Sequence, residues 1–339
     1  MTFLIAVVML GLIIFVHELG HFLTAKLFKM PVSEFSIGMG PQVFSVDTKK
    51  TTYSFRAIPI GGYVNIEGME VGSEVENGFS SKPAYQRFIV LFAGVFMNFL
   101  MAFILLFVTA KISGRIEYDT NAIIGGLVKG GANEQILKVD DKILELDGKK
   151  INIWTDISKV TKELQDKEEI TALVERNGKE ENLTLKLTKD EENNRVVLGI
   201  SPKYKKIDLS TTESLDFAKN SFNSILIDTV KGFFTIFSGK VSLKEVSGPV
   251  GIFKVVGEVS KFGWISIASL CVVLSINIGV LNLLPIPALD GGRIIFVLLE
   301  LVGIKVNKKW EEKLHKGGMI LLLFFILMIS VNDVWKLFN

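Results

Sequence analysis

Four long apolar stretches constrain this chain more than any other feature. They cover residues 2–23, 88–110, 262–289 and 317–335, and each is close to or above the roughly 20 residues that an α-helix needs to cross a bilayer. Hydrophobic residues make up 49% of the 339-residue chain and its mean hydropathy is +0.40, which is too apolar for a pair of soluble domains. The sequence therefore predicts a mainly α-helical, polytopic membrane protein with four transmembrane helices.

The first stretch is not a typical signal peptide. It lacks a basic segment at its start and a small-residue cleavage site, so we expect it to remain in the mature protein. The formal net charge of +2, without a basic run interleaved with aromatic residues, argues against a nucleic-acid partner. The single cysteine, Cys271, excludes a disulfide framework and a cysteine-based zinc site.

Lysine and arginine predict the orientation. They are concentrated between the first two stretches and between the last two, so the positive-inside rule places both of these segments in the cytoplasm. Both chain termini and residues 111–261 are then expected outside.

Residues 114–203 have the pattern of a soluble α+β domain. Apolar and polar residues alternate on both sides of Asn177-Gly178, which predicts a hairpin, and a second turn is expected at Asp147-Gly148. Together with "LVKGGANEQILKVDDKILELDGKKI", the order of short strands, one helix and a hairpin resembles a bacterial PDZ domain. Ile136 and Asp140 stand where that family usually has glycine. The resemblance implies a module that binds a peptide or acts as a gate; a small α+β spacer is the alternative.

A helix is expected between this domain and the third apolar stretch. Residues 210–239 place apolar side chains at helical spacing, which predicts an amphipathic helix at the outer membrane surface or one packed on the soluble domain. The predicted organisation has four parts: an N-terminal half of the membrane core (1–113), a PDZ-like domain (114–203), an amphipathic membrane-surface region (204–261) and a C-terminal half of the core (262–339).

Three ionisable residues interrupt the first apolar stretch. In "HELGH", His17 and His21 are four apart and share one face of a helix, while Glu18 lies beside them. This is the arrangement by which zinc hydrolases hold a metal ion and a general base. A charged side chain inside a membrane costs several kcal/mol by most estimates, about 2.5–3.5 on insertion scales, so such residues are functional by default.

A catalytic zinc ion needs a third protein ligand and an open position for water. The remaining histidine, His315, lies in a basic segment that is expected to be a cytoplasmic loop, so the third ligand should be a carboxylate. Three acidic residues compete for this role: Asp290, Glu300 and Asp333. The first helix should bring His17 into the cytoplasmic half of the membrane, about 21 Å along its axis. Asp290 reaches a similar depth and Asp333 does not. Glu300 is interpreted as a surface carboxylate, but it would be the critical ligand of a membrane-anchored metalloprotease that cuts exposed loops.

The sequence before Asp290 also predicts an irregular segment. In "SINIGVLNLLPIPALDGGR", Pro285 and Pro287 break a helix, which at membrane depth requires cover by protein or a wet cavity. Asn277 and Asn282 add amides that suit either hydrogen bonds between helices or anchoring of a substrate.

With these motifs, the chain resembles the site-2 protease family of intramembrane zinc metalloproteases, and in particular its bacterial RseP branch. "FSSKPAYQRFIVLFAGVFMNFLMAF" and "SGPVGI" match further family segments. The resemblance implies that His17, His21 and Asp290 bind one zinc ion, that Glu18 is the general base, and that Asn277 and Asn282 assist substrate or transition-state binding. Val95 replaces the usual proline of an "AGPxxN" pattern, and there is room for one PDZ domain where some relatives have two.

The resemblance also assigns the first cytoplasmic loop. Short strands interrupted by Gly38, Gly40, Gly61 and Gly62 are expected to form a β-structured, membrane-associated loop that binds an unwound substrate by β-augmentation. The implied partners are the lipid bilayer and single-span transmembrane substrates, such as an anti-sigma factor or a signal-peptide remnant. The implied location is the bacterial cytoplasmic membrane. An inactive membrane scaffold with a PDZ-like module is the remaining alternative.

Overall fold

The computed structural model describes residues 2–69, 75–128, 130–164, 167–190, 195–239, 248–304 and 306–338. The chain divides into two compact units, and each is described by itself. The first consists of Met1–Ile112 and Ser210–Asn339, and the second of Ser113–Leu209.

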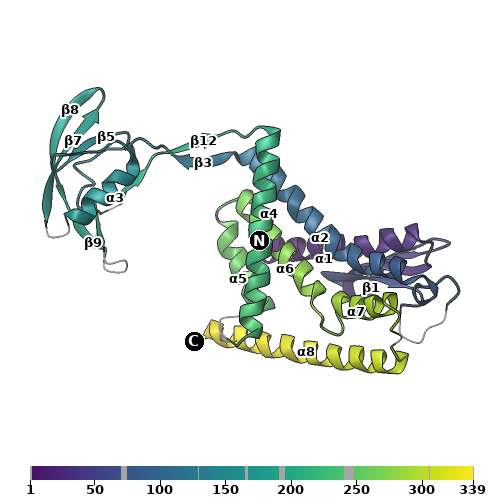
Figure 1. Ribbon diagram of the computed structural model, residues 1–339. Helices are drawn as coiled ribbons and strands as arrows, with labels where there is room; N and C mark the ends of the chain where they lie inside the picture. Colours follow the sequence, from purple (N-terminus) through teal and green to yellow (C-terminus); the bar gives the residue numbers. More distant parts are fainter. Residues whose placement is uncertain are drawn as a thin grey trace. The chain divides into compact units, whose positions relative to one another are not determined.

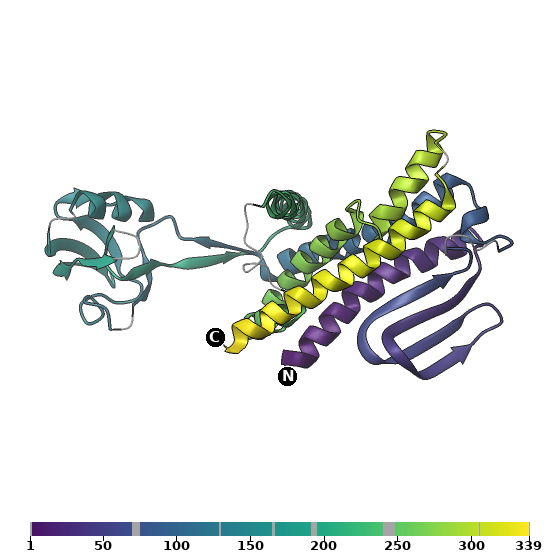
Figure 2. The ribbon, with the colours of Figure 1, turned by 90° about the horizontal axis from the view of Figure 1, so that it is seen from below.

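The first unit is largely helical (Figures 1 and 2). Its elements are α1 (Thr2–Leu27), β1 (Val32–Asp47), β2 (Thr52–Ile66), a 3-10 turn (Phe79–Ser81), α2 (Ala84–Ser113), α4 (Thr211–Phe237), α5 (Pro249–Ser260), α6 (Trp264–Leu283), α7 (Asp290–Leu301) and α8 (Lys308–Phe338). Within the described ranges, four helices are long and apolar enough to cross a membrane: α1, α2, α6 and the Lys309–Asp333 part of α8. The prediction of four apolar helices is confirmed.

The third predicted stretch is divided in the structure. Helix α6 ends at Leu283, residues 284–289 form an irregular link, and Asp290 is the first residue of the separate helix α7. Pro285 and Pro287 lie in this link, as expected for residues that remove backbone donors and break a helix. The link is what allows Asp290 to face helix α1.

Helix α4 begins with a capping box, because Ser210 accepts a hydrogen bond from the Glu213 amide and Glu213 reaches back to the Ser210 amide. Its apolar face packs on α2 and α6, and the Phe222 ring lies 5.8 Å from that of Phe99 between centroids. Figure 2 views α4 nearly along its axis while α1, α6 and α8 run across the view, so α4 crosses these helices steeply. Its predicted position at the outer membrane surface stays a prediction.

Strands β1 and β2 form a long antiparallel hairpin beside α1 (Figure 2). The glycines fit its irregular register: Gly38 adopts a φ of 88°, and a Cβ on Gly62 would lie 2.6 Å from the carbonyl oxygen of Ser36. Aromatic rings attach the hairpin to the helix, with Phe22 of α1 4.9 Å from Phe35 of β1 between ring centroids. The structure thus has a β-structured loop between the first two apolar helices.

The second unit has an α+β fold with its own core. Its elements are β3 (Arg115–Tyr118), β4 (Ile124–Leu127), β5 (Lys142–Leu146), β6 (Lys149–Lys150), α3 (Trp154–Glu163), β7 (Glu169–Arg176), β8 (Lys179–Lys186), β9 (Thr188–Asp190), β10 (Arg195–Val197), β11 (Ile200–Pro202) and β12 (Tyr204–Ile207). The main sheet has the order β6-β5-β7-β8. Buried side chains of this sheet and α3, including Ile143, Val174 and Ile157, form one cluster.

Both turns predicted in this unit are confirmed. Asn177 and Gly178 have positive φ between β7 and β8, and Asp147 and Gly148 do the same between β5 and β6. Asp140 also has a positive φ of 74°. This conformation explains why the PDZ pattern usually has glycine there, and aspartate is one of the few other residues that tolerate it.

Candidate active site

Helix α1 presents His17, Glu18 and His21 to the interior of the first unit. Both imidazoles are almost fully buried, and the site forms where α1 lies against α2. The two helices are close because Gly20 has no side chain: a Cβ there would lie 2.3 Å from the carbonyl oxygen of Ala93. Because Gly20 has no side chain, the turn of α1 that carries His17 and His21 can pack directly against α2.

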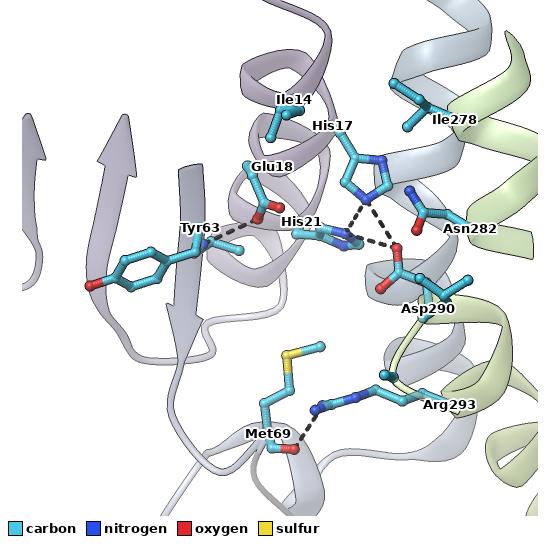
Figure 3. A pocket seen from close by; sticks show the side chains of 13 residues that line it. Ile14, His17, Glu18, His21, Tyr63, Met69, Ile278, Asn282, Asp290 and Arg293 are labelled. Atoms are coloured by element: carbon cyan, nitrogen blue, oxygen red, sulfur yellow. Dashed lines mark hydrogen bonds and ion pairs between the residues drawn. The ribbon is translucent and has the colours of Figure 1, made fainter. Parts of the chain in front are cut away.

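The side chains of His17, His21 and Asp290 converge on one point (Figure 3). The Nε2 atom of His17 lies 3.1 Å from Oδ2 of Asp290, Nε2 of His21 lies 3.2 Å from the same oxygen, and the two Nε2 atoms are 3.2 Å apart. Among the described residues, these three are the group of His, Cys, Asp and Glu side chains with a spacing that suits a metal ion. Two histidines and the carboxylate are thus brought together as the sequence predicted.

The spacing and chemistry of this group fit zinc. Ligand atoms about 2.1 Å from a shared tetrahedral ion stand about 3.4 Å apart, close to the separations observed. His21 directs Nδ1 at the carbonyl oxygen of Val90, 2.8 Å away, so that nitrogen carries the proton and Nε2 presents a lone pair. Lone pairs that meet a carboxylate at this distance repel it unless a proton or a metal ion lies between them, and the spacing of the three ligand atoms suits a metal ion.

Glu18 lies beside the group without joining it. Its Oε2 atom accepts a hydrogen bond of 3.1 Å from the backbone amide of Val64, on the β2 edge that faces α1. The hairpin therefore fixes the direction of this carboxylate next to the three converging side chains.

These residues line a pocket of about 450 Å³. Asn282 of α6 and Arg293 of α7 lie on one side of it, and Tyr63 of β2 lies on the other (Figure 3). Val64 of β2 is also a lining residue. The hydroxyl of Tyr63 points away from the three converging side chains and bonds to Glu34. Burial and this bond raise the pKa of Tyr63 above its usual value, so the hydroxyl stays protonated.

Other predicted site residues lie elsewhere. Asn277 is one helical turn or more from Asn282, and its Oδ1 accepts a 2.7 Å hydrogen bond from Thr229 of α4, so its side chain faces that helix. The four glycines Gly38, Gly40, Gly61 and Gly62 belong to the hairpin but do not line the pocket, where Tyr63 and Val64 follow them.

The two competing carboxylates have other partners. Glu300 forms an ion pair with Arg87, and half of its side chain is exposed. Asp333 accepts a 2.8 Å hydrogen bond from the amide of Gly251 at the start of α5. Neither belongs to the converging group, so the structure favours Asp290 among the three acidic residues.

Two residues near the site have structural functions that the sequence did not reveal. His315, expected in a loop, lies in α8 and accepts a 3.1 Å hydrogen bond from the amide of Ala288, two residues before Asp290. Gly94 of α2 gives space to the histidines: a Cβ there would lie 2.5 Å from Nε2 of His21 and 2.8 Å from Cε1 of His17. For Gly94 the sequence offered one signal, the stretch "AGVFMN", which corresponds to the family's "AGPxxN" pattern.

Comparison with protein-family models gives a match to peptidase family M50 over residues 5–325. The chain belongs to peptidase family M50. This is the site-2 protease family, so the chain is a membrane-embedded metalloprotease that uses zinc, and its multi-pass, mainly helical architecture agrees with that membership.

Individual M50 relatives match along the whole chain. A protein of Clostridium acetobutylicum named as a zinc metalloprotease is 33% identical over 333 residues, which covers 97% of this chain and 96% of the relative. The Regulator of sigma-W protease RasP of Bacillus subtilis is 27% identical over 424 residues, which covers 99% of this chain and 99% of that relative.

Among solved structures, a PDZ domain of an SdrC-like protein from Listeria monocytogenes matches 25% of this chain and 90% of that domain, with 16% identity and a TM-score of 0.22.

Proposed function

We propose that this chain cleaves peptide bonds within transmembrane segments of single-span membrane proteins, with one zinc ion held by His17, His21 and Asp290. The observation that carries the proposal is the convergence of three ligand atoms within about 3 Å of one another, two of them on α1, a helix long and apolar enough to cross a membrane. These side chains are nearly buried, and their burial in such a place needs a compensating cation.

Glu18 is the general base of this reaction. A zinc ion held by His17, His21 and Asp290 would supply a Lewis acid, which would lower the pKa of a bound water toward neutrality and polarise the scissile carbonyl. Glu18 accepts the water proton and passes it to the leaving amine. The amide of Val64 holds Oε2, and we assign the proton transfer to Oε1.

Asn282 is suited to stabilise the developing oxyanion. It lines the pocket on the side where His17 and Asp290 also lie, and its carboxamide has donor hydrogens for a substrate oxygen. Asn277 contributes to the reaction only indirectly, because its hydrogen bond with Thr229 anchors α4 on α6.

The β2 strand supplies a place for an unwound substrate. A peptide bond inside an α-helix is shielded by its own hydrogen bonds, so a transmembrane substrate must open before attack. Strand β2 lines the pocket at Tyr63 and Val64; the Val64 amide is taken by Glu18, so an extended segment would pair with other backbone groups along this edge, as in β-augmentation.

The relation to RasP suggests the class of substrate. That relative's name describes a protease that regulates sigma-W. An anti-sigma factor with a single span, already shortened on its outer side, is therefore the first substrate we propose, and a signal-peptide remnant is the second. The site then lies in the cytoplasmic half of the bacterial cytoplasmic membrane, with the PDZ-like unit and both termini outside.

The substrate is identified by comparing the membrane proteins of cells that carry wild-type protein or Glu18→Gln. We expect a single-span protein or a signal-peptide remnant to accumulate with Glu18→Gln only. If the proteins that accumulate are instead multi-pass proteins that wild-type cells cut in exposed loops, an intramembrane site would be contradicted.

A further inference from the structure

Helix α2 lines the back of the histidine pair with three residues that share one face. Val90, Gly94 and Asn98 follow one another at intervals of four along α2, so they lie one above another. Val90 offers its carbonyl oxygen to Nδ1 of His21, and Gly94 leaves the space that the two rings fill. The third member, Asn98, lies against Nδ1 of His17.

The side chain of Asn98 is completely buried, and its hydrogen bonding is incomplete. Its Nδ2 atom lies 3.4 Å from Nδ1 of His17, a long contact, while its Oδ1 atom is buried without a hydrogen-bond partner. Leaving a buried acceptor unsatisfied costs about 1–3 kcal/mol. A fully buried amide in a membrane helix therefore calls for a partner that satisfies Oδ1.

The chemistry of His17 supplies that partner. A neutral imidazole that offers its Nε2 lone pair to a metal ion carries its proton on Nδ1. The Nδ1–H group of His17 then faces Asn98 and needs an acceptor. Rotation of the carboxamide by 180° exchanges Oδ1 and Nδ2, two atoms that only their hydrogen bonds distinguish. After this rotation Oδ1 receives the proton of His17, and Nδ2 takes the buried position that Oδ1 leaves.

We propose that Asn98 is a positioning residue whose Oδ1 accepts the Nδ1–H of His17 and fixes the ring in the tautomer that presents Nε2 to zinc. Helix α2 then provides one acceptor for each histidine, the Val90 carbonyl for His21 and the Asn98 carboxamide for His17. The inference rests on the proposed function, because it takes His17 as a zinc ligand.

Asn98 is itself held in place by the third apolar helix. Ser275 of α6 donates a 2.9 Å hydrogen bond from Oγ to the backbone carbonyl of Asn98, and both residues are fully buried. This bond uses the backbone of Asn98 and not its carboxamide. Ser275→Ala is therefore a matched control that disturbs the same point of α2 and leaves the acceptor.

The test measures zinc affinity by chelator competition on full-length protein in detergent. Asn98→Leu, similar in shape but without an acceptor, should bind zinc about 10- to 100-fold more weakly, the usual effect of losing such a partner. Asn98→Asp, which keeps an acceptor oxygen, and Ser275→Ala should stay near the wild-type affinity. If Asn98→Leu does not fold, Asn98→Ala removes the same acceptor without adding branches.

Histidine-selective ¹⁵N spectra provide a second measurement, because the chain has only three histidines. Zinc should shift the Nε2 signal of His17 in every variant that binds it, and Nδ1–H of His17 should be hydrogen-bonded in wild type and Asn98→Asp but not in Asn98→Leu.

The outcomes separate two failures. Wild-type affinity in Asn98→Leu, or an equal loss in Asn98→Asp and Asn98→Leu, would overturn the role of Asn98. An Nε2 signal of His17 that zinc does not move would instead overturn the ligand assignment.

Discussion

Nε2 of His17 lies 3.1 Å from Oδ2 of Asp290, although 273 positions separate the two residues in the sequence. One belongs to the first helix of the chain and the other begins α7, after the link that contains Pro285 and Pro287. The site therefore exists only when the two halves of the membrane core pack together, and it depends on the helix break as much as on the HELGH motif.

Asp290→Ala should remove stoichiometric zinc from the purified protein, because two histidines alone leave the ion without its third protein ligand. Glu300→Ala is the control: this carboxylate pairs with Arg87 at a partly exposed position, and its loss should leave zinc content and cleavage near wild type. Metal analysis of both purified variants measures the zinc content, and full zinc occupancy in Asp290→Ala would contradict the ligand set.

Gly94→Ala should lower zinc content and activity together. The added methyl group would lie 2.5 Å from Nε2 of His21, so at least one imidazole must move. Gly232→Ala on the exposed side of α4 is the matched control, since a Cβ there meets no atom within 4 Å. Equal zinc content in both variants would show that α2 does not set the position of the histidines.

The stability of the second unit, Ser113–Leu209, should depend on Asp141 above about pH 4. Burial raises the pKa of Asp141, but the hydrogen bonds from Arg176 and from the Lys138 amide outweigh burial, so the pKa is lower in the folded state. The stabilisation is present above the unfolded pKa of about 3.9 and is lost as pH falls through the lower folded pKa.

Asp141→Asn should therefore reduce the free energy of unfolding at pH 7 by about 1.5–3 kcal/mol, and this difference should shrink below pH 4. Urea unfolding of a fragment covering residues 113–209, followed by the fluorescence of Trp154, measures it. Glu169→Gln, which removes a weak exposed pair with Lys186, should change it by less than about 1 kcal/mol. A pH-independent difference would refute the ionic explanation.

Topology gives a fourth prediction. In a Cys271→Ala background, cysteines at Lys49 and Lys308 should be protected from a membrane-impermeant thiol reagent in intact cells, while one at Glu180 should react. The distribution of lysine and arginine is the basis of this expectation. Labelling of Lys49→Cys from outside would contradict the predicted orientation.

The metal-binding group could be predicted from sequence because each member carries a separate signal. His17 and His21 combine the i, i+4 spacing with an apolar helix, and Asp290 follows a helix break at a matching depth. The four apolar helices and the two hairpin turns were predictable for the same reason, since length, hydropathy and Asn-Gly or Asp-Gly are local signals.

The parts that escaped sequence analysis depend on tertiary packing. Nothing local shows that Asn277 faces Thr229 or that Gly94 gives space to the imidazoles, because each contact joins separate helices. His315 appeared to lie in a loop because charged residues surround it, yet α8 begins before them at Lys308. Helix α5 also went unpredicted, and its first turn uses Asp333 from α8 as an acceptor.

The most direct test of the central claim is cleavage of a single-span substrate by purified, zinc-loaded protein in liposomes, with the products mapped by mass spectrometry. Wild type should cut inside the transmembrane segment, and replacing helix-breaking residues of that segment with leucine should slow the reaction. Glu18→Gln should keep its zinc and lose a factor of about 10² to 10⁴ in rate, because glutamine cannot accept the water proton. Cleavage by Glu18→Gln at the wild-type rate, or cuts confined to residues outside the membrane, would contradict an intramembrane zinc protease that uses Glu18 as its base.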